Sequence, residues 1–134
     1  MIGIVVVSHG KLARELVRAT EHVVGEQPAF RSISIEAEDD IDDRRDQIRE
    51  TVKACNTGKG VIILTDMFGG TPSNLALSNL NPGKVDVIGG VNLPMLIHLV
   101  QVRSDLTLEE AVNATCDAGR RYIRIGSEVL SRTK

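Results

Sequence analysis

The hydrophobic residues of this chain alternate between short apolar runs and longer segments with helical spacing. The runs predict strands at Ile2–Val7, Phe30–Ile35, Gly60–Thr65 and Val85–Gly89. The intervening and following segments predict helices at about 12–24, 41–55, 71–79, 94–102 and 107–118. This alternating order predicts an α/β fold of three layers, α/β/α, with a mainly parallel four-stranded sheet.

The ends of several helices carry recognisable residue types. Thr71 suits an N-cap with Pro72 at the first helical position, and Thr107 with Glu110 three residues later forms a capping-box pattern. The last stretch, Tyr122–Leu130, is compatible either with an extension of the preceding helix or with a short strand. The 134 residues are expected to form one domain, 1–134.

Composition and charge exclude several classes of function. The aromatic content of 2% argues against stacking a flavin or single-stranded nucleic acid, and the net charge of −2 without a basic cluster argues against nucleic-acid binding. Cys55 and Cys116 form no CxxC or zinc-like group, so we expect neither a metal nor a cofactor. The apolar start, Met1–Val7, is too short for a signal peptide or a membrane span, which predicts a cytoplasmic protein.

Two predicted strands end in residues that can carry chemistry. The first ends at Ser8-His9-Gly10, and the third is followed by Asp66 and a glycine loop. Sites in parallel sheets form at the carboxyl ends of strands where the strand order reverses. With a flavodoxin-like order of 2-1-3-4, which is an assumption at this point, these two strands are neighbours and His9 lies beside Asp66.

This pair of residues suits phosphoryl transfer. A carboxylate that accepts one ring N–H of a histidine fixes the tautomer and leaves the other nitrogen free as a nucleophile. The loop and helix start after Asp66 offer backbone donors for a phosphate, at Gly69, Gly70, Thr71 and Ser73. Each feature alone is more often structural, and only their combination favours a function for His9.

Other uses of such a sheet lack their motifs. The chain contains neither a GxxxxGKS/T phosphate loop nor a GxGxxG dinucleotide fingerprint. A response-regulator receiver needs acidic residues at the end of the first strand, where this chain has Val7-Ser8-His9. His22 and His98 lie inside predicted helices without a carboxylate at a suitable spacing, and we interpret them as surface or packing residues.

Three segments together resemble a known family. These are Val7–Gly10 (VSHG), Thr65–Asn74 (TDMFGGTPSN) and Gly90–Leu96 (GVNLPML). They look like the IIA component of the mannose family of the bacterial sugar phosphotransferase system, in family order and at family-like spacing over nearly the whole chain. The resemblance implies that His9 takes a phosphoryl group from the carrier HPr and passes it to a IIB component, with Asp66 orienting the imidazole.

The resemblance has further implications for assembly. It implies a homodimer in which a C-terminal strand is exchanged, so that Tyr122–Leu130 would add a fifth strand. The sequence ends at Lys134 without a IIB domain, from which we expect IIB on a separate chain. The membrane components IIC and IID would be reached only indirectly, and the sugar is not readable from this chain.

Three alternatives stay open. The same His9 chemistry would serve a regulatory module whose phosphorylation state controls a partner protein. The phosphoryl-donor subunit of a dihydroxyacetone kinase has a similar fold, although the FGGTPSN loop favours the sugar-transport branch. A plain anion-binding protein would bind phosphate without transferring it.

Overall fold

The centre of the protein is a four-stranded parallel sheet. The computed structural model describes residues 1–131. Strands β1 (Gly3–His9), β2 (Phe30–Ile35), β3 (Val61–Thr65) and β4 (Val85–Gly89) lie in the order β2-β1-β3-β4, and every pairing is parallel. The predicted fold class and the assumed 2-1-3-4 order are therefore confirmed.

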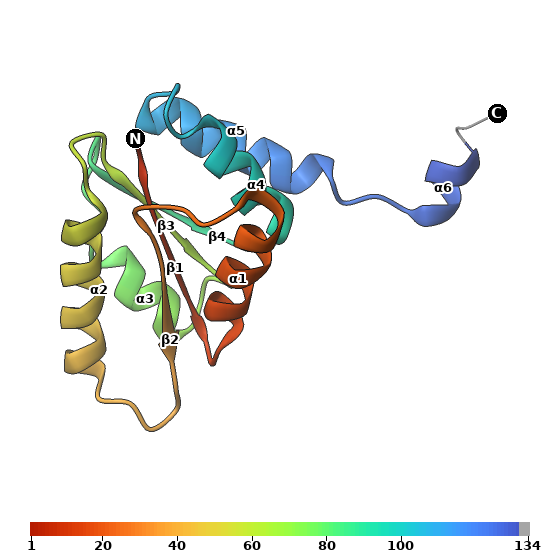
Figure 1. Ribbon diagram of the computed structural model, residues 1–134. Coiled ribbons are helices and arrows are strands. Elements are labelled where there is room, and N and C mark those ends of the chain that lie inside the picture. Colours follow the sequence, from red (N-terminus) through yellow and green to blue (C-terminus); the bar gives the residue numbers. More distant parts are fainter. Residues whose placement is uncertain (132–134) are drawn as a thin grey trace.

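Helices cover both faces of this sheet, and a further short helix follows near the C-terminus (Figure 1). The helices are α1 (Leu12–Val24), α2 (Ile41–Cys55), α3 (Thr71–Leu77), α4 (Leu93–Val102), α5 (Leu108–Arg121) and α6 (Gly126–Ser131). Alternate residues of β1 point to opposite faces, as the strand period requires. Val5 and Val7 pack in the apolar cluster with residues of α2 and α3, whereas Ile4 and Val6 belong to the cluster with α1, α4 and α5.

Several helices begin at residues of the types that cap helices. Asn92 caps α4 by accepting from the Met95 N–H at 3.1 Å, and Thr107 and Glu110 form the predicted capping box of α5. One prediction was wrong by a residue: Gly70, not Thr71, is the N-cap of α3, and Thr71 is its first helical residue. Gly70 takes this position because its extended backbone ends the loop that follows β3.

The C-terminal stretch follows neither of the two forms expected for it. Helix α5 ends at Arg121, and after a short break Gly126–Ser131 forms the separate helix α6, which lies away from the body of the molecule (Figure 1). Within residues 1–131 the sheet has four strands, so this single chain does not form the expected fifth strand. Ile123 and Ile125 are 76% and 61% exposed there, because no other part of the described chain covers them.

Candidate functional site

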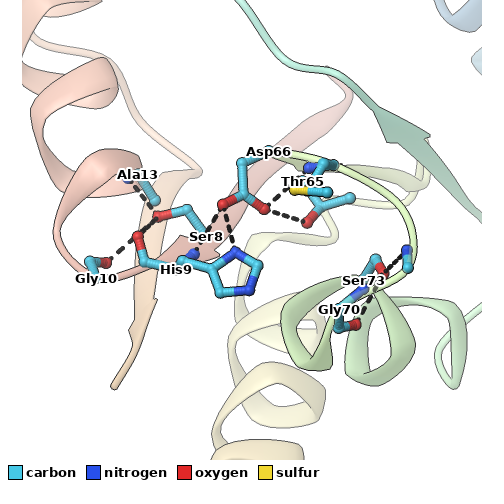
Figure 2. Close-up of polar contacts among 10 residues, drawn as sticks. Ser8, His9, Gly10, Ala13, Thr65, Asp66, Gly70 and Ser73 are labelled. Carbon is cyan, nitrogen blue, oxygen red and sulfur yellow. Dashed lines mark hydrogen bonds and ion pairs between the residues drawn. The ribbon is translucent and has the colours of Figure 1, made fainter. Parts of the chain in front are cut away.

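The structure brings His9 and Asp66 together at one edge of the sheet. Strands β1 and β3 are direct neighbours in parallel register, with Val7 opposite Thr65, so their carboxyl ends meet. His9 is the last residue of β1, and Asp66 follows β3 directly. The His9 ring nitrogen Nδ1 lies 2.8 Å from Asp66 Oδ2 (Figure 2), which is the contact that the sequence predicted.

The carboxylate of Asp66 is bonded through both of its oxygens. Oδ2 also accepts the backbone N–H of His9 at 2.9 Å, and Oδ1 accepts the Met67 N–H at 2.9 Å and the Thr65 hydroxyl at 3.3 Å. Burial by itself raises the pKa of Asp66, but the hydrogen bonds from His9 and Met67 outweigh it, so the pKa is lowered from its ordinary value. Asp66 is therefore ionised at neutral pH and accepts rather than donates.

An ionised Asp66 assigns the tautomer of His9. Because a carboxylate only accepts hydrogen bonds, Nδ1 carries a proton, and in the neutral imidazole the lone pair then lies on Nε2. The His9 side chain is 54% exposed while that of Asp66 is 12% exposed. The pair thus consists of a buried carboxylate and an accessible ring with one free nitrogen.

The backbone of Gly70 lies against the free edge of that ring. A Cβ atom added at Gly70 would fall 2.9 Å from both Cε1 and Nε2 of His9, which is closer than side chains normally approach. Glycine at this position therefore allows the loop and the imidazole to touch. The neighbouring Gly69 has φ of +101°, a left-handed conformation that favours glycine.

Ser73 closes the glycine loop with its hydroxyl. The Ser73 Oγ accepts the N–H of Gly69 at 3.1 Å and that of Gly70 at 3.3 Å, and it donates to the Gly70 carbonyl at 2.9 Å (Figure 2). The structure thus places Gly70 beside the His9 ring, and hydrogen bonds to Ser73 join Gly69, Gly70 and Ser73 in one turn. Thr71 is exposed at the start of α3, where first-turn amides have no acceptor within the helix.

Sequence reasoning gave no role to Ser8, which shapes the other side of the site. Ser8 is fully buried, and its Oγ accepts the Ala13 N–H at 2.6 Å and lies 3.3 Å from the Gly10 carbonyl, to which it can donate. These contacts fix the turn between β1 and α1 from which His9 projects (Figure 2). A serine directly before the strand-end histidine, and close to a helix start, was the available signal.

The other histidines of residues 1–131 lie apart from this pair. His22 is exposed in the last turn of α1, and His98 is half-buried in α4. Within residues 1–131, no group of three or more His, Cys, Asp and Glu side chains is arranged to hold a metal ion. A cavity of about 530 Å³ lies at the opposite edge of the sheet, lined in part by Lys59, Lys84 and Arg103, and it contains neither residue of the pair.

No helix in the part of the chain that the structure describes is both long and apolar enough to span a membrane.

Comparisons with known proteins agree on one family. The family model described as "PTS system fructose IIA component", where PTS is the phosphotransferase system, matches residues 3–116. The fructose-specific EIIA component of Bacillus subtilis is 26% identical over 135 aligned positions, which cover 100% of this chain and 92% of the relative. The mannose-specific EIIAB component of Escherichia coli K12 is 31% identical over 92% of this chain, which spans only 39% of that longer protein.

A solved structure supports the same conclusion. The phosphotransferase system component EIIA from Streptococcus agalactiae superposes with a TM-score of 0.86 at 26% identity, covering 96% of this chain and 99% of that one. Sequence motifs, sheet order, the His9–Asp66 pair and these relatives converge. The chain belongs to the mannose/fructose family of IIA components of the bacterial phosphoenolpyruvate-dependent sugar phosphotransferase system.

Proposed function

We propose that His9 is a phosphoryl acceptor, which takes the group from phosphorylated HPr and passes it to a IIB component for coupled sugar import and phosphorylation. The observation that carries this proposal is the 2.8 Å contact between His9 Nδ1 and the ionised Asp66, because it places the lone pair of the neutral imidazole on Nε2 of an exposed ring. The family membership supports the same role, since IIA components act within the phosphotransferase system.

The transfer step needs little movement of protons. The lone pair on His9 Nε2 attacks phosphorus, an N–P bond forms, and the bond between phosphorus and the donor's histidine nitrogen breaks with its electron pair returning to the donor ring. The positive charge that develops on the His9 ring is stabilised by Asp66, which keeps accepting the Nδ1 proton. In the second transfer the acceptor side chain of IIB attacks phosphorus, and the N–P bond to His9 breaks with its electron pair returning to Nε2.

The glycine loop is the proposed support for the transferred group. Gly70 touches the Nε2 edge of the ring, so a phosphoryl group on Nε2 would lie beside the backbone of Gly69, Gly70 and Thr71. Backbone N–H groups of such a loop suit phosphate oxygens. We assign the phosphate-binding loop to Gly69, Gly70, Thr71 and Ser73, in which the backbone contacts the phosphate and Ser73 positions the loop, with Asp66 and His9 as the catalytic pair.

The exposure of the site favours protein partners. The His9 ring lies at an open sheet edge, next to the half-exposed apolar side chains of Leu12, Met67 and Phe68. Such an exposed ring can be reached by the phosphorylated histidine of another protein, as transfer between two histidines requires. We also propose that the protein acts in the cytoplasm and reaches the membrane components IIC and IID only indirectly. It would form a homodimer that buries the exposed side chains of Ile123 and Ile125.

The test is phosphoryl transfer with purified components. The protein is mixed with phosphoenolpyruvate, enzyme I and HPr, and an acid-labile, alkali-stable phosphate is sought on the wild type, on His9→Ala and on the matched control His22→Ala. We expect label on the wild type and on His22→Ala only. Label on His9→Ala would reject the assigned nucleophile, and no label on any protein with a working donor would reject the carrier function.

The acceptor is tested in a second step. Labelled protein is freed of donor and mixed with a IIB component from the same organism, and the label should move to IIB within seconds. Retention of the label on His9 would instead favour the regulatory role, in which the phosphorylated state itself is read by a partner.

A further inference from the structure

The hydroxyl of Ser73 occupies the two amides nearest the proposed phosphoryl position. Ser73 is 0% exposed, and its Oγ accepts from both the Gly69 and the Gly70 N–H (Figure 2). A phosphate bound through these amides must therefore take them from Ser73. A direct contact between phosphate and the buried Ser73 side chain is the less accessible arrangement.

The two bonds to Ser73 are at the weak end of the range. Their donor–acceptor distances are 3.1 and 3.3 Å, whereas bonds to charged oxygens are typically about 2.7–2.9 Å and roughly twice as strong. An exchange of a neutral hydroxyl for phosphoryl oxygens is thus favourable for both amides. The loop is already beside the ring edge that carries Nε2, because a Cβ added at Gly70 would fall 2.9 Å from that nitrogen.

We propose that Ser73 is a positioning residue whose hydroxyl is a placeholder acceptor: it holds the Gly69 and Gly70 amides in the unphosphorylated protein and releases them to the phosphoryl oxygens on His9. This inference rests on the proposed function of His9. No covalent bond to Ser73 forms or breaks, and only hydrogen-bond partners exchange. After the exchange Oγ still donates to the Gly70 carbonyl, which also accepts the Asn74 N–H at 3.0 Å.

The placeholder role and a merely structural role predict opposite signs. If Ser73 competes with the phosphoryl group, Ser73→Ala removes the competitor and makes the phosphorylated form relatively more stable. If Ser73 only braces the loop, the same change loosens the phosphate site and makes that form less stable. The Gly70 carbonyl keeps its bond from Asn74 in either case, so Ser73→Ala mainly affects the two amides.

The experiment measures the equilibrium of phosphoryl transfer between HPr and this protein. We expect Ser73→Ala to shift the equilibrium constant about three- to tenfold toward the phosphorylated form. Ser78→Ala is the matched control, because Ser78 also donates its hydroxyl to a backbone carbonyl, that of Leu75 at 2.6 Å, but at the far end of α3. A shift toward the unphosphorylated form, or none, overturns the proposal.

Amide proton chemical shifts give a second readout. In unphosphorylated Ser73→Ala the Gly69 and Gly70 amides should differ from the wild type, and on phosphorylation the two proteins should converge to similar, downfield values. If the Gly69 and Gly70 amide proton shifts of the wild type do not change on phosphorylation, the proposal is also overturned. Failure of the function itself looks different: then neither the wild type nor Ser73→Ala takes up phosphate, whatever their amide shifts.

Discussion

Replacing Gly70 by alanine should separate catalysis from stability. The backbone of Gly70 has φ of −121° and ψ of 177°, an extended conformation that alanine adopts without strain. The fold should therefore tolerate Gly70→Ala, and the reduced freedom of the unfolded chain stabilises by about 0.4–1 kcal/mol where no clash intervenes. The clash that does occur is with the His9 ring alone.

The structure gives the size of that clash. The new Cβ would lie 2.9 Å from Cε1 and Nε2 of His9, while ordinary contacts are 3.4–4 Å, so ring and loop must separate by at least half an ångström. His9 is the part that can move, because its side chain is half-exposed, and such a movement strains the 2.8 Å bond to Asp66. Misplacement of a reacting group by about 1 Å can cost about 100-fold in rate, so we expect phosphorylation to slow by about 10- to 100-fold.

The assay is single-turnover phosphorylation by rapid quench, first with phosphorylated HPr and then with the small donor phosphoramidate. A lower rate with both donors would show that the defect lies in the position of the His9 ring and not in the docking of HPr. Gly126→Ala is the control, because a Cβ there meets nothing within 4 Å. Wild-type phosphorylation rates in Gly70→Ala, with the folded state intact by urea denaturation, would refute the reasoning.

Four further outcomes are expected. Asp66→Asn should keep the fold but slow the phosphorylation of His9 about 100-fold in the same assay, because an amide orients the ring less well and carries no charge. Because the pKa of Asp66 is lowered in the folded protein, its ionisation contributes stability that is fully present above about pH 4 and is lost as the pH falls through the folded pKa. Urea midpoints measured over this pH range should therefore fall less for Asp66→Asn than for the wild type. Asn92→Ala should cost about 1 kcal/mol in urea denaturation without changing the phosphorylation rate, because it removes the cap on Met95. Truncation before Tyr122 should give monomers in sedimentation, and an undisturbed dimer would count against a role of the tail in association.

The sequence predicted the parallel sheet, and together with an assumed strand order it predicted the contact between His9 and Asp66. Apolar runs such as Ile2–Val7 can be buried on both faces only in the middle of a parallel sheet, and the alternation with helices then restricts the strand order. Once β1 and β3 are neighbours, the residues after them must meet, and His9 and Asp66 do so. This prediction needed no side-chain geometry beyond the parallel register.

The finer features depend on geometry that residue types do not specify. The sequence placed Ser73 in the predicted phosphate loop, whereas only the structure shows that the turn directs the amides of Gly69 and Gly70 onto its hydroxyl. The helix cap moved from Thr71 to Gly70 for the same reason, since the path of the loop decides which residue is extended. The tail after Arg121 has no local pattern strong enough to choose a structure, and its side chains Ile123 and Ile125 remain 76% and 61% exposed.

Asp66 links the fold to the chemistry more closely than a simple orienting residue does. Its carboxylate accepts four donors, which are the backbone and ring N–H groups of His9, the Met67 N–H and the Thr65 hydroxyl. One group thus ties the end of β1 to the end of β3 and also sets the tautomer of the ring. Asparagine supplies one accepting oxygen for these donors, so Asp66→Asn alters stability and catalysis together. Gly70→Ala leaves the other three donors in place and displaces only the ring with its N–H, so the rate difference between the two variants measures how much of Asp66's effect is orientation and how much is charge.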